Sequence, residues 1–265
     1  MKTYLTLSAI ALAAAATLSS GVVMAADPAP AATPDFVVTG NFGITSDYRF
    51  RGISQNDQDP SMQGGFDVAH SSGLYVGTWG SNVSTWTAGA GSLELDLYGG
   101  YKTELSGVGV DVGFIAYTYP GSVQSTTHAD TEEAYVGLSY GPATFKTSYV
   151  LGKNYFASTG TTNVSAKGTM YYDLTLTQEL MPKLTASIHA GYTDFRKDAE
   201  STAGKFSYAD YSVGVAYDLN GYVFGVKYFT NDAKVGTRAY AGTAGSGTGK
   251  NLLKDGFAVS LTKAF

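Results

Sequence analysis

The stretch LELDLYGGYKT, residues 93–103, alternates apolar and polar side chains with a period of two. Leu95 and Leu97 fall on one face of an extended segment, and Glu94 and Asp96 fall on the other. Because successive side chains of a β-strand point to opposite faces, this pattern predicts a strand with one apolar and one polar face. The same alternation recurs in three further stretches, which are 184–195, 208–219 and 222–230.

Read along the chain, this period predicts about twelve strands between Thr39 and the C-terminus. The connections between them alternate in length. Tight turns are predicted at 71–73, 104–107, 141–142, 180–183 and 220–221. Long polar loops rich in Gly, Ser and Thr are predicted at 52–61, 83–92, 120–131, 152–168, 196–207 and 231–254. This alternation is typical of an all-β fold, the transmembrane antiparallel up-and-down β-barrel with short periplasmic turns and long extracellular loops.

A barrel in lipid must close, because no water satisfies an unpaired strand edge in hydrocarbon. The first predicted strand, Thr39–Arg51, should therefore pair with the last, Asp255–Phe265. The alternation also places outward aromatic rings near both ends of the strands, as expected for the two membrane interfaces. The periplasmic belt would contain Tyr101, Tyr140, Tyr217, Tyr222 and Phe265, and the outer belt Tyr48, Phe50, Tyr149, Tyr172, Tyr192, Tyr228 and Phe257.

The N-terminal residues predict export. Lys2 is followed by an almost wholly small or apolar stretch, residues 5–18, and Ala25 ends a run suited to cleavage, so residues 1–25 are predicted to be a signal peptide. The apolar stretch is shorter than a spanning helix needs. Residues 26–38, which include three prolines, are predicted to form a flexible periplasmic leader, and residues 39–265 a single outer-membrane barrel domain.

Composition excludes several classes of function. The formal net charge is −5, so nothing indicates nucleic acid as a partner. The chain has no cysteine, which excludes a disulfide framework and thiolate chemistry. It has 20 Tyr, 13 Phe and 33 Gly, residue types that barrels use at the membrane interfaces and where the wall bends.

Charged and polar side chains on the inward face are the predicted pore lining. They are Asp47, Arg49, Arg51, Asp67, Glu94, Asp96, Lys102, Asp111, Glu133, Lys146, Asp173, His189, Asp218 and Lys227. The eight acids in this list outnumber the five Lys and Arg side chains, and an acidic excess in a narrow passage predicts a weak preference for cations. The same mixed lining could instead form charge ladders that hold the shape of the barrel.

Candidate catalytic and metal-binding residues have simpler interpretations. His70 precedes Ser72 by two residues, as in outer-membrane phospholipases, but the pair falls at a predicted periplasmic turn, so turn chemistry is favoured. His128 lies close to Asp130, Glu132 and Glu133 and could help to bind a divalent cation, although a solvated acidic loop is the preferred interpretation. Gly249-Lys250 lacks the strand-to-helix setting of a phosphate loop. No catalytic, metal or cofactor site is predicted.

Two stretches resemble known sequences. The block GNFGITSDYRFRGISQNDQDPSMQGGFDVAHSSGLYVGTWGSNV, residues 40–83, resembles the opening signature of the TorF-type porin family, whose members are outer-membrane proteins of Gram-negative bacteria. The ending FAVSLTKAF resembles the C-terminal assembly signal of outer-membrane barrels through Phe257, Val259, Leu261 and Phe265, while Lys263 departs from it. The resemblance implies a pore but names no substrate.

These observations predict a porin-like channel for passive passage of small hydrophilic solutes or ions, in the outer membrane of a Gram-negative bacterium. About twelve strands lie between the filled barrels of about 8 strands and the open ones of about 16, and loop 231–254 is long enough to constrict the pore. Two alternatives remain: a plugged structural or recognition barrel whose extracellular loops bind a surface partner, and an outer-membrane enzyme. The expected partners are outer-membrane lipid, the barrel-assembly machinery, periplasmic chaperones, and small solutes or ions.

Overall fold

The computed structural model describes residues 35–84, 91–121, 129–156, 165–196, 207–234 and 250–265. The predicted signal peptide, residues 26–34 of the predicted leader, His128 and most of loop 231–254 lie outside these residues. In the described part of the chain, no helix is long and apolar enough to cross a membrane.

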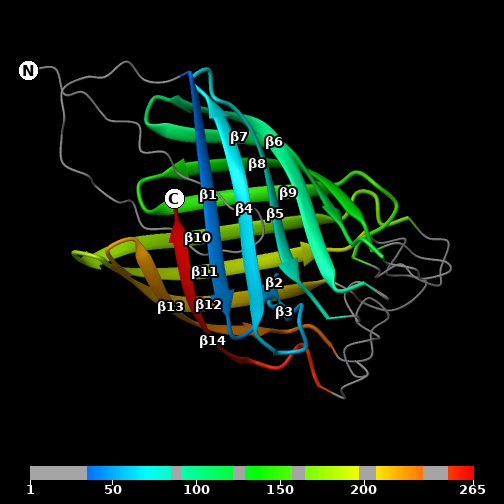
Figure 1. Ribbon diagram of the computed structural model, residues 1–265. Coiled ribbons are helices and arrows are strands. Elements are labelled where there is room, and N and C mark those ends of the chain that lie inside the picture. The colour runs from blue at the N-terminus through cyan, green and yellow to red at the C-terminus, as the bar shows by residue number, and fades with distance from the viewer. Residues whose placement is uncertain (1–34, 85–90, 122–128, 157–164, 197–206, 235–249) are drawn as a thin grey trace, which may run out of the picture.

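Twelve strands form one closed antiparallel barrel, and two short strands form a separate hairpin (Figure 1). This confirms the predicted fold class. The barrel strands are β1 (Phe36–Thr45), β4 (Ser61–His70), β5 (Leu74–Asn82), β6 (Leu93–Leu105), β7 (Val108–Thr118), β8 (Thr131–Tyr140), β9 (Ala143–Val150), β10 (Met170–Met181), β11 (Leu184–Asp194), β12 (Tyr208–Leu219), β13 (Tyr222–Asn231) and β14 (Gly256–Ala264). The hairpin consists of β2 (Arg49–Phe50) and β3 (Ile53–Ser54).

The seam of the barrel joins β1 to β14. Their register runs from Asn41 opposite Ala264 to Thr45 opposite Ser260. Beyond it, the backbones of Gly40 and Phe265 exchange two hydrogen bonds, with N–O distances of 2.8 and 2.9 Å. The first and last strands therefore pair as predicted.

The wall has apolar side chains outside and polar side chains inside. Leu95 and Val213 expose 41% and 51% of their surface on the outer face, whereas Glu94 and Asp96 expose 2% and 0% inside. This is the reverse of a water-soluble protein, and it suits a barrel whose outer solvent is hydrocarbon. Tight turns join the strands at one end; at Asn220 and Gly221 both φ angles are positive, 54° and 82°, as a type I′ turn requires.

The bounds of the first strand differ from the prediction. It was expected at Thr39–Arg51, but β1 begins at Phe36, which pairs with His70, and ends at Thr45. The predicted leader is therefore shorter by three residues. The strand ends early because the chain leaves the wall after Thr45 and enters the barrel. Tyr48 and Phe50, predicted in the outer aromatic belt, lie inside the barrel, and Tyr48 is 2% exposed, so their assignment to the belt was wrong.

Candidate functional site: the barrel interior

Residues 47–57, called here the inner hairpin, fold into the barrel near the end where the long connections leave it (Figure 1). Arg49 pairs with Ser54 and Phe50 with Ile53. The chain reverses through Arg51 and Gly52, whose φ angles are 48° and 79°. Ten of the eleven residues are buried, and Phe50 is half-buried. The predicted pore-lining residues Asp47, Arg49 and Arg51 thus belong to this hairpin and not to the first wall strand.

Arg51 joins the inner hairpin to the wall through an ion pair. Its guanidinium donates two hydrogen bonds to the Glu133 carboxylate on β8, at 2.9 and 2.7 Å, and one to the Tyr155 hydroxyl at 2.8 Å. The two charged side chains expose 5% and 1% of their surface. Burial alone would lower the pKa of Arg51, but the Glu133 carboxylate outweighs it and holds that pKa above its ordinary value. The paired carboxylate thus holds the buried guanidinium in its charged form.

Aromatic rings surround the same guanidinium. Its central carbon lies 4.1 Å from the ring centre of Tyr171 on β10, 5.8 Å from that of Tyr155 and 5.9 Å from that of Phe156. The ring of Phe50, in the hairpin itself, lies 4.7 Å away. These distances are within the range of cation–π attraction. We call Glu133, Tyr155, Phe156 and Tyr171 the Arg51 cage.

The backbone at the tip of the hairpin is fixed by the opposite wall. The Tyr208 hydroxyl on β12 donates to the carbonyl of Arg51 at 2.9 Å, and the Asn231 amide on β13 donates to the carbonyl of Gly52 at 3.3 Å. A side chain at Gly52 would meet the Asp210 Cβ at 2.7 Å, so this close approach requires glycine. The inner hairpin therefore bridges the two sides of the barrel.

Tyr48 joins the base of the hairpin to β6. The hydroxyls of Tyr48 and Tyr119 donate to the two carboxylate oxygens of Glu94, each at 2.8 Å. Burial, followed by the nearby charge of Glu94, raises the pKa of Tyr48 well above its usual value, so the phenol stays protonated as a donor. Its ring packs edge-on against Trp79, with ring centres 5.5 Å apart.

The hairpin also makes internal contacts, apolar contacts and backbone hydrogen bonds to other segments, from Ser54 N–H to the Leu252 carbonyl at 3.1 Å and from Ser84 N–H to the Gln55 carbonyl at 2.9 Å. Arg49 pairs with Asp47 at 2.7 Å, and Ser54 donates to the same carboxylate at 2.7 Å. Two apolar clusters flank the hairpin and fill the outer half of the lumen. One comprises Ile53, Val150, Tyr155, Ala166, Phe195, Tyr208, Leu252 and Leu253, and the other Tyr48, Trp79, Val83, Tyr98, Ile115, Tyr117, Tyr119, Ala129 and Tyr135.

The other predicted pore-lining residues lie on inward positions of the wall strands. They are Asp67, Glu94, Asp96, Lys102, Asp111, Glu133, Lys146, Asp173, His189, Asp218 and Lys227. Several make local contacts. Tyr98 donates to Asp67 at 2.7 Å, and His189 lies 3.3 Å from Asp173 and 3.0 Å from Asp210.

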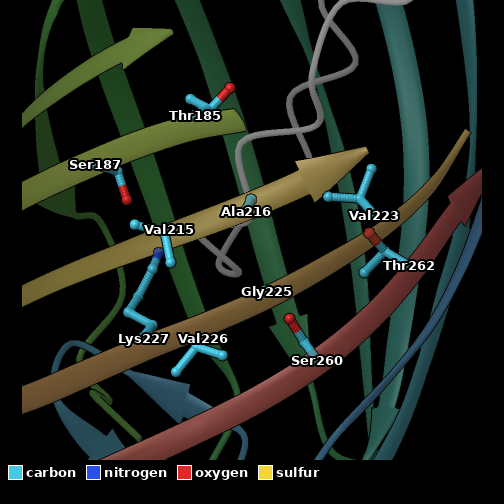
Figure 2. Close-up of a pocket in the computed structure, with 10 residues that line it drawn as sticks. All are labelled: Thr185, Ser187, Val215, Ala216, Val223, Gly225, Val226, Lys227, Ser260 and Thr262. Carbon is cyan, nitrogen blue, oxygen red and sulfur yellow. The ribbon is translucent and has the colours of Figure 1, made fainter. Parts of the chain in front are cut away.

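The inner half of the lumen contains a pocket between β11 and β14. Its polar lining consists of Thr185, Ser187, Lys227, Ser260 and Thr262. Figure 2 shows the Lys227 side chain extending from β13 toward β12. Gly214 leaves room for it, since a side chain there would lie 3.1 Å from the Cβ and Cγ of Lys227. The pocket is thus bordered by hydroxyl groups, one ammonium group and the apolar residues Val215, Ala216, Val223 and Val226.

The alternative sites have local structural roles. His70 Nδ1 lies 2.8 Å from the Ser72 hydroxyl and accepts the Ser72 backbone N–H at 3.1 Å, which is turn chemistry at an exposed position. The acids near His128 point in different directions, because Glu133 faces the lumen, Glu132 is exposed and Asp130 accepts the Tyr119 backbone N–H. Among the described residues, no group of three or more His, Asp or Glu is placed to hold a metal ion.

Residues 29–265 match the protein family described as "Bacterial protein of unknown function (Gcw_chp)". The chain belongs to this family. That description does not name the TorF-type porins that residues 40–83 resemble. A search of curated proteins by sequence finds no match.

Solved structures similar to this Gcw_chp chain include porins. The NanC porin has a TM-score of 0.52 at 10% identity, covering 86% of this chain and 99% of its own. The KdgM porin in complex with disordered oligogalacturonate has a TM-score of 0.50 at 7% identity, with the same two coverages. At such identities the likeness concerns the fold, which is that of outer-membrane porins.

Sequence reasoning missed several residues of the Gcw_chp lumen. Asp210, which contacts His189 and Tyr171, shares the inward parity of Asp218 on the same strand, and that parity could have revealed it. Tyr171 and Tyr155 were missed because aromatic rings were assigned to the lipid face or to loops. No sequence signal indicates that Arg51 reaches Glu133, 82 residues further along the chain.

Proposed function

We propose that this protein is a channel in the outer membrane of a Gram-negative bacterium, of the TorF type that it resembles, for passive passage of small hydrophilic solutes or ions. The observation that carries the proposal is the contrast between an apolar outer wall and a lumen that contains buried charged and hydroxyl side chains, with a pocket in its inner half. The porin fold of the solved relatives supports it.

The passage is narrow because the inner hairpin occupies the outer half of the lumen. Loop 231–254 was expected to constrict the pore, and its few described residues include Leu252 and Leu253, which pack in the cluster beside Ile53. In the described part of the chain the main constriction is residues 47–57. This limits the proposed cargo to ions and small solutes.

The charges of the lumen support a weak preference for cations. Glu133 and Asp47 are paired with Arg51 and Arg49. Within the described residues, no ion pair involves three acids on β4 and β6, which are Asp67, Glu94 and Asp96. Carboxylates not neutralised by fixed bases attract cations to a narrow passage when they are ionised. Burial of Glu94 and Asp96 opposes their ionisation, so the expected preference is weak.

A plugged recognition barrel is the second candidate. The inner hairpin favours it, because ten of its residues are buried and Arg51 is held by two hydrogen bonds to Glu133. In this reading the extracellular loops bind a surface partner and the lumen stays closed. We propose no catalytic role. Assembly is proposed to use the barrel-assembly machinery and periplasmic chaperones, with membrane lipid around the wall.

Replacing residues 47–57 by a four-residue Gly-Ser turn tests the proposal in planar bilayers. The replacement is feasible because Thr45 and Ser61, which flank the segment, are direct partners in the β1–β4 ladder. The wild-type protein should show a small conductance and the replaced variant one several-fold larger. Reversal potentials in a KCl gradient should report cation preference in both.

The outcomes separate the candidates. If the wild-type protein does not conduct and the variant with residues 47–57 replaced does, the result favours the plugged barrel. If neither conducts while both show the gel mobility of a folded barrel, the channel proposal is wrong. Anion preference in the wild type would contradict the proposed cation selectivity but not the proposed channel function.

A further inference from the structure

We propose that the Arg51 cage is a binding site for small organic cations of the guanidinium class, with Arg51 as its built-in occupant, and that such solutes bind there by displacing Arg51. The inference rests on the proposed channel function and deepens it by naming a class of solute. It also gives the inner hairpin a role besides narrowing the lumen, because Arg51, which attaches the hairpin to the wall, would compete with the transported solute for the same site.

The first argument is the chemistry of the cage. Glu133 supplies two carboxylate oxygens that match the two parallel N–H bonds of a guanidinium, at 2.9 and 2.7 Å. The ring face of Tyr171 lies 4.1 Å from the central carbon of that cation, and the Tyr155 hydroxyl accepts a third bond at 2.8 Å. Carboxylates and aromatic faces are the groups that select planar organic cations over hydrated metal ions.

The second argument is that the cage belongs to the wall and to the chain after β9, whereas its occupant comes from the hairpin. Glu133 lies in the β8 ladder opposite Ile115 and Val150. The Tyr171 hydroxyl donates to Asp210 at 3.1 Å, and the Tyr155 ring packs against Phe195 with ring centres 5.0 Å apart. Because each member has contacts of its own, the cage should keep its shape when Arg51 leaves.

The third argument is the conformation of the occupant. Arg51 has a φ of 48°, in the left-handed region that non-glycine residues adopt rarely and at a cost. A free guanidinium solute carries no such backbone constraint.

The test uses the refolded Arg51→Ala protein with methylguanidinium chloride as the probe. The midpoint of thermal unfolding is measured against KCl of equal ionic strength. Methylguanidinium on the order of 10 mM should raise the midpoint, and the rise should grow with the logarithm of concentration, as ligand linkage requires. The Arg51→Ala/Glu133→Ala double variant should lose the effect.

Arg49→Ala is the matched control. Arg49 lies in the same hairpin and pairs with Asp47, but only one ring centre, that of Phe229 at 5.8 Å, lies near its guanidinium among the described residues. Methylguanidinium should not raise the midpoint of this variant above that in KCl. Should Arg51→Ala fail to refold, Arg51→Lys replaces it, and methylguanidinium must raise the midpoint of that variant above its value in KCl.

The current in planar bilayers provides the second readout. Methylguanidinium added on the side of the long loops should reduce the potassium current of Arg51→Ala, and the double variant should be insensitive. If methylguanidinium stabilises Arg51→Ala no better than KCl, the cage is not a cation site, even when the channel conducts. A stabilising effect without conductance in any variant would instead preserve the cage and overturn the channel function.

Discussion

Tyrosine hydroxyls donate hydrogen bonds to two of the acids on one side of the lumen, Glu94 and Asp67. Glu94 receives the hydroxyls of Tyr48 and Tyr119, and Asp67 receives that of Tyr98. A tyrosine supplies a hydrogen-bond donor without adding a positive charge, so it does not neutralise the carboxyl group that it bonds. This arrangement suits a passage that attracts cations, because a base in the same place would neutralise an ionised carboxylate.

Tyr48→Phe removes one of these donors and leaves a buried oxygen of Glu94 without its partner. We expect the free energy of unfolding to fall by about 1 to 3 kcal/mol, measured by urea unfolding in lipid vesicles with gel mobility as the readout. Tyr211→Phe is the control, since Tyr211 faces outward on β12 with 48% of its surface exposed. An equal loss in the two variants would show that the Tyr48 hydroxyl contributes nothing specific.

At the scale of elements, β14 closes the barrel and also presents the proposed assembly signal. Phe257, Val259 and Phe265 are outward and at least half exposed. Phe265 has a second role, because its backbone exchanges two hydrogen bonds with Gly40 and its ring packs near Phe66, with ring centres 6.3 Å apart. The last residue thus belongs to the seam as well as to the signal.

Deletion of Phe265 should slow barrel assembly in cells and leave refolding in detergent largely intact. The seam would lose two backbone hydrogen bonds, a cost of about 1 to 3 kcal/mol, against a ladder of five residue pairs that remains. Pulse-chase accumulation of the heat-modifiable folded form measures assembly. Unchanged accumulation would show that the C-terminal stretch is not the assembly signal.

The wall strands were predictable because a period of two is a property of the extended backbone itself. Residues 93–103 and 222–230 show it clearly, and β6 and β13 cover both stretches. The inner hairpin was not predictable by the same rule. Asp47, Tyr48 and Arg49 continue the alternation of β1, so nothing local marks the point where the chain leaves the wall. Its course depends on Glu94 and Glu133, which lie 46 and 82 residues away from their hairpin partners.

At the scale of the whole molecule, the outer face of the wall meets hydrocarbon and the inner face meets the polar lumen. Successive residues of each strand face the two environments in turn. Neighbours in sequence such as Glu94 and Leu95 therefore have opposite requirements. Glu94 needs donors in the lumen, and Leu95 needs a hydrocarbon surface.

Leu95→Arg and Val213→Arg should impair folding into vesicles far more than Glu94→Gln. A lipid-facing arginine at mid-depth costs about 2 to 4 kcal/mol, whereas the glutamine carbonyl can still accept a bond from Tyr48 or Tyr119 in place of the carboxylate. The folded fraction after dilution into vesicles is the measurement. Similar folded fractions for the three variants would contradict the assignment of faces.

The direct pairing of Thr45 with Ser61 at the base of the inner hairpin has a consequence for how such proteins diversify. An insertion whose two ends meet at one pair of neighbouring strands can lengthen, shorten or change sequence without altering the register of the twelve-stranded wall. The wall can thus stay unchanged while residues 47–57 are replaced by another sequence. Natural variation in what the lumen admits can then arise by replacing a single local stretch of chain.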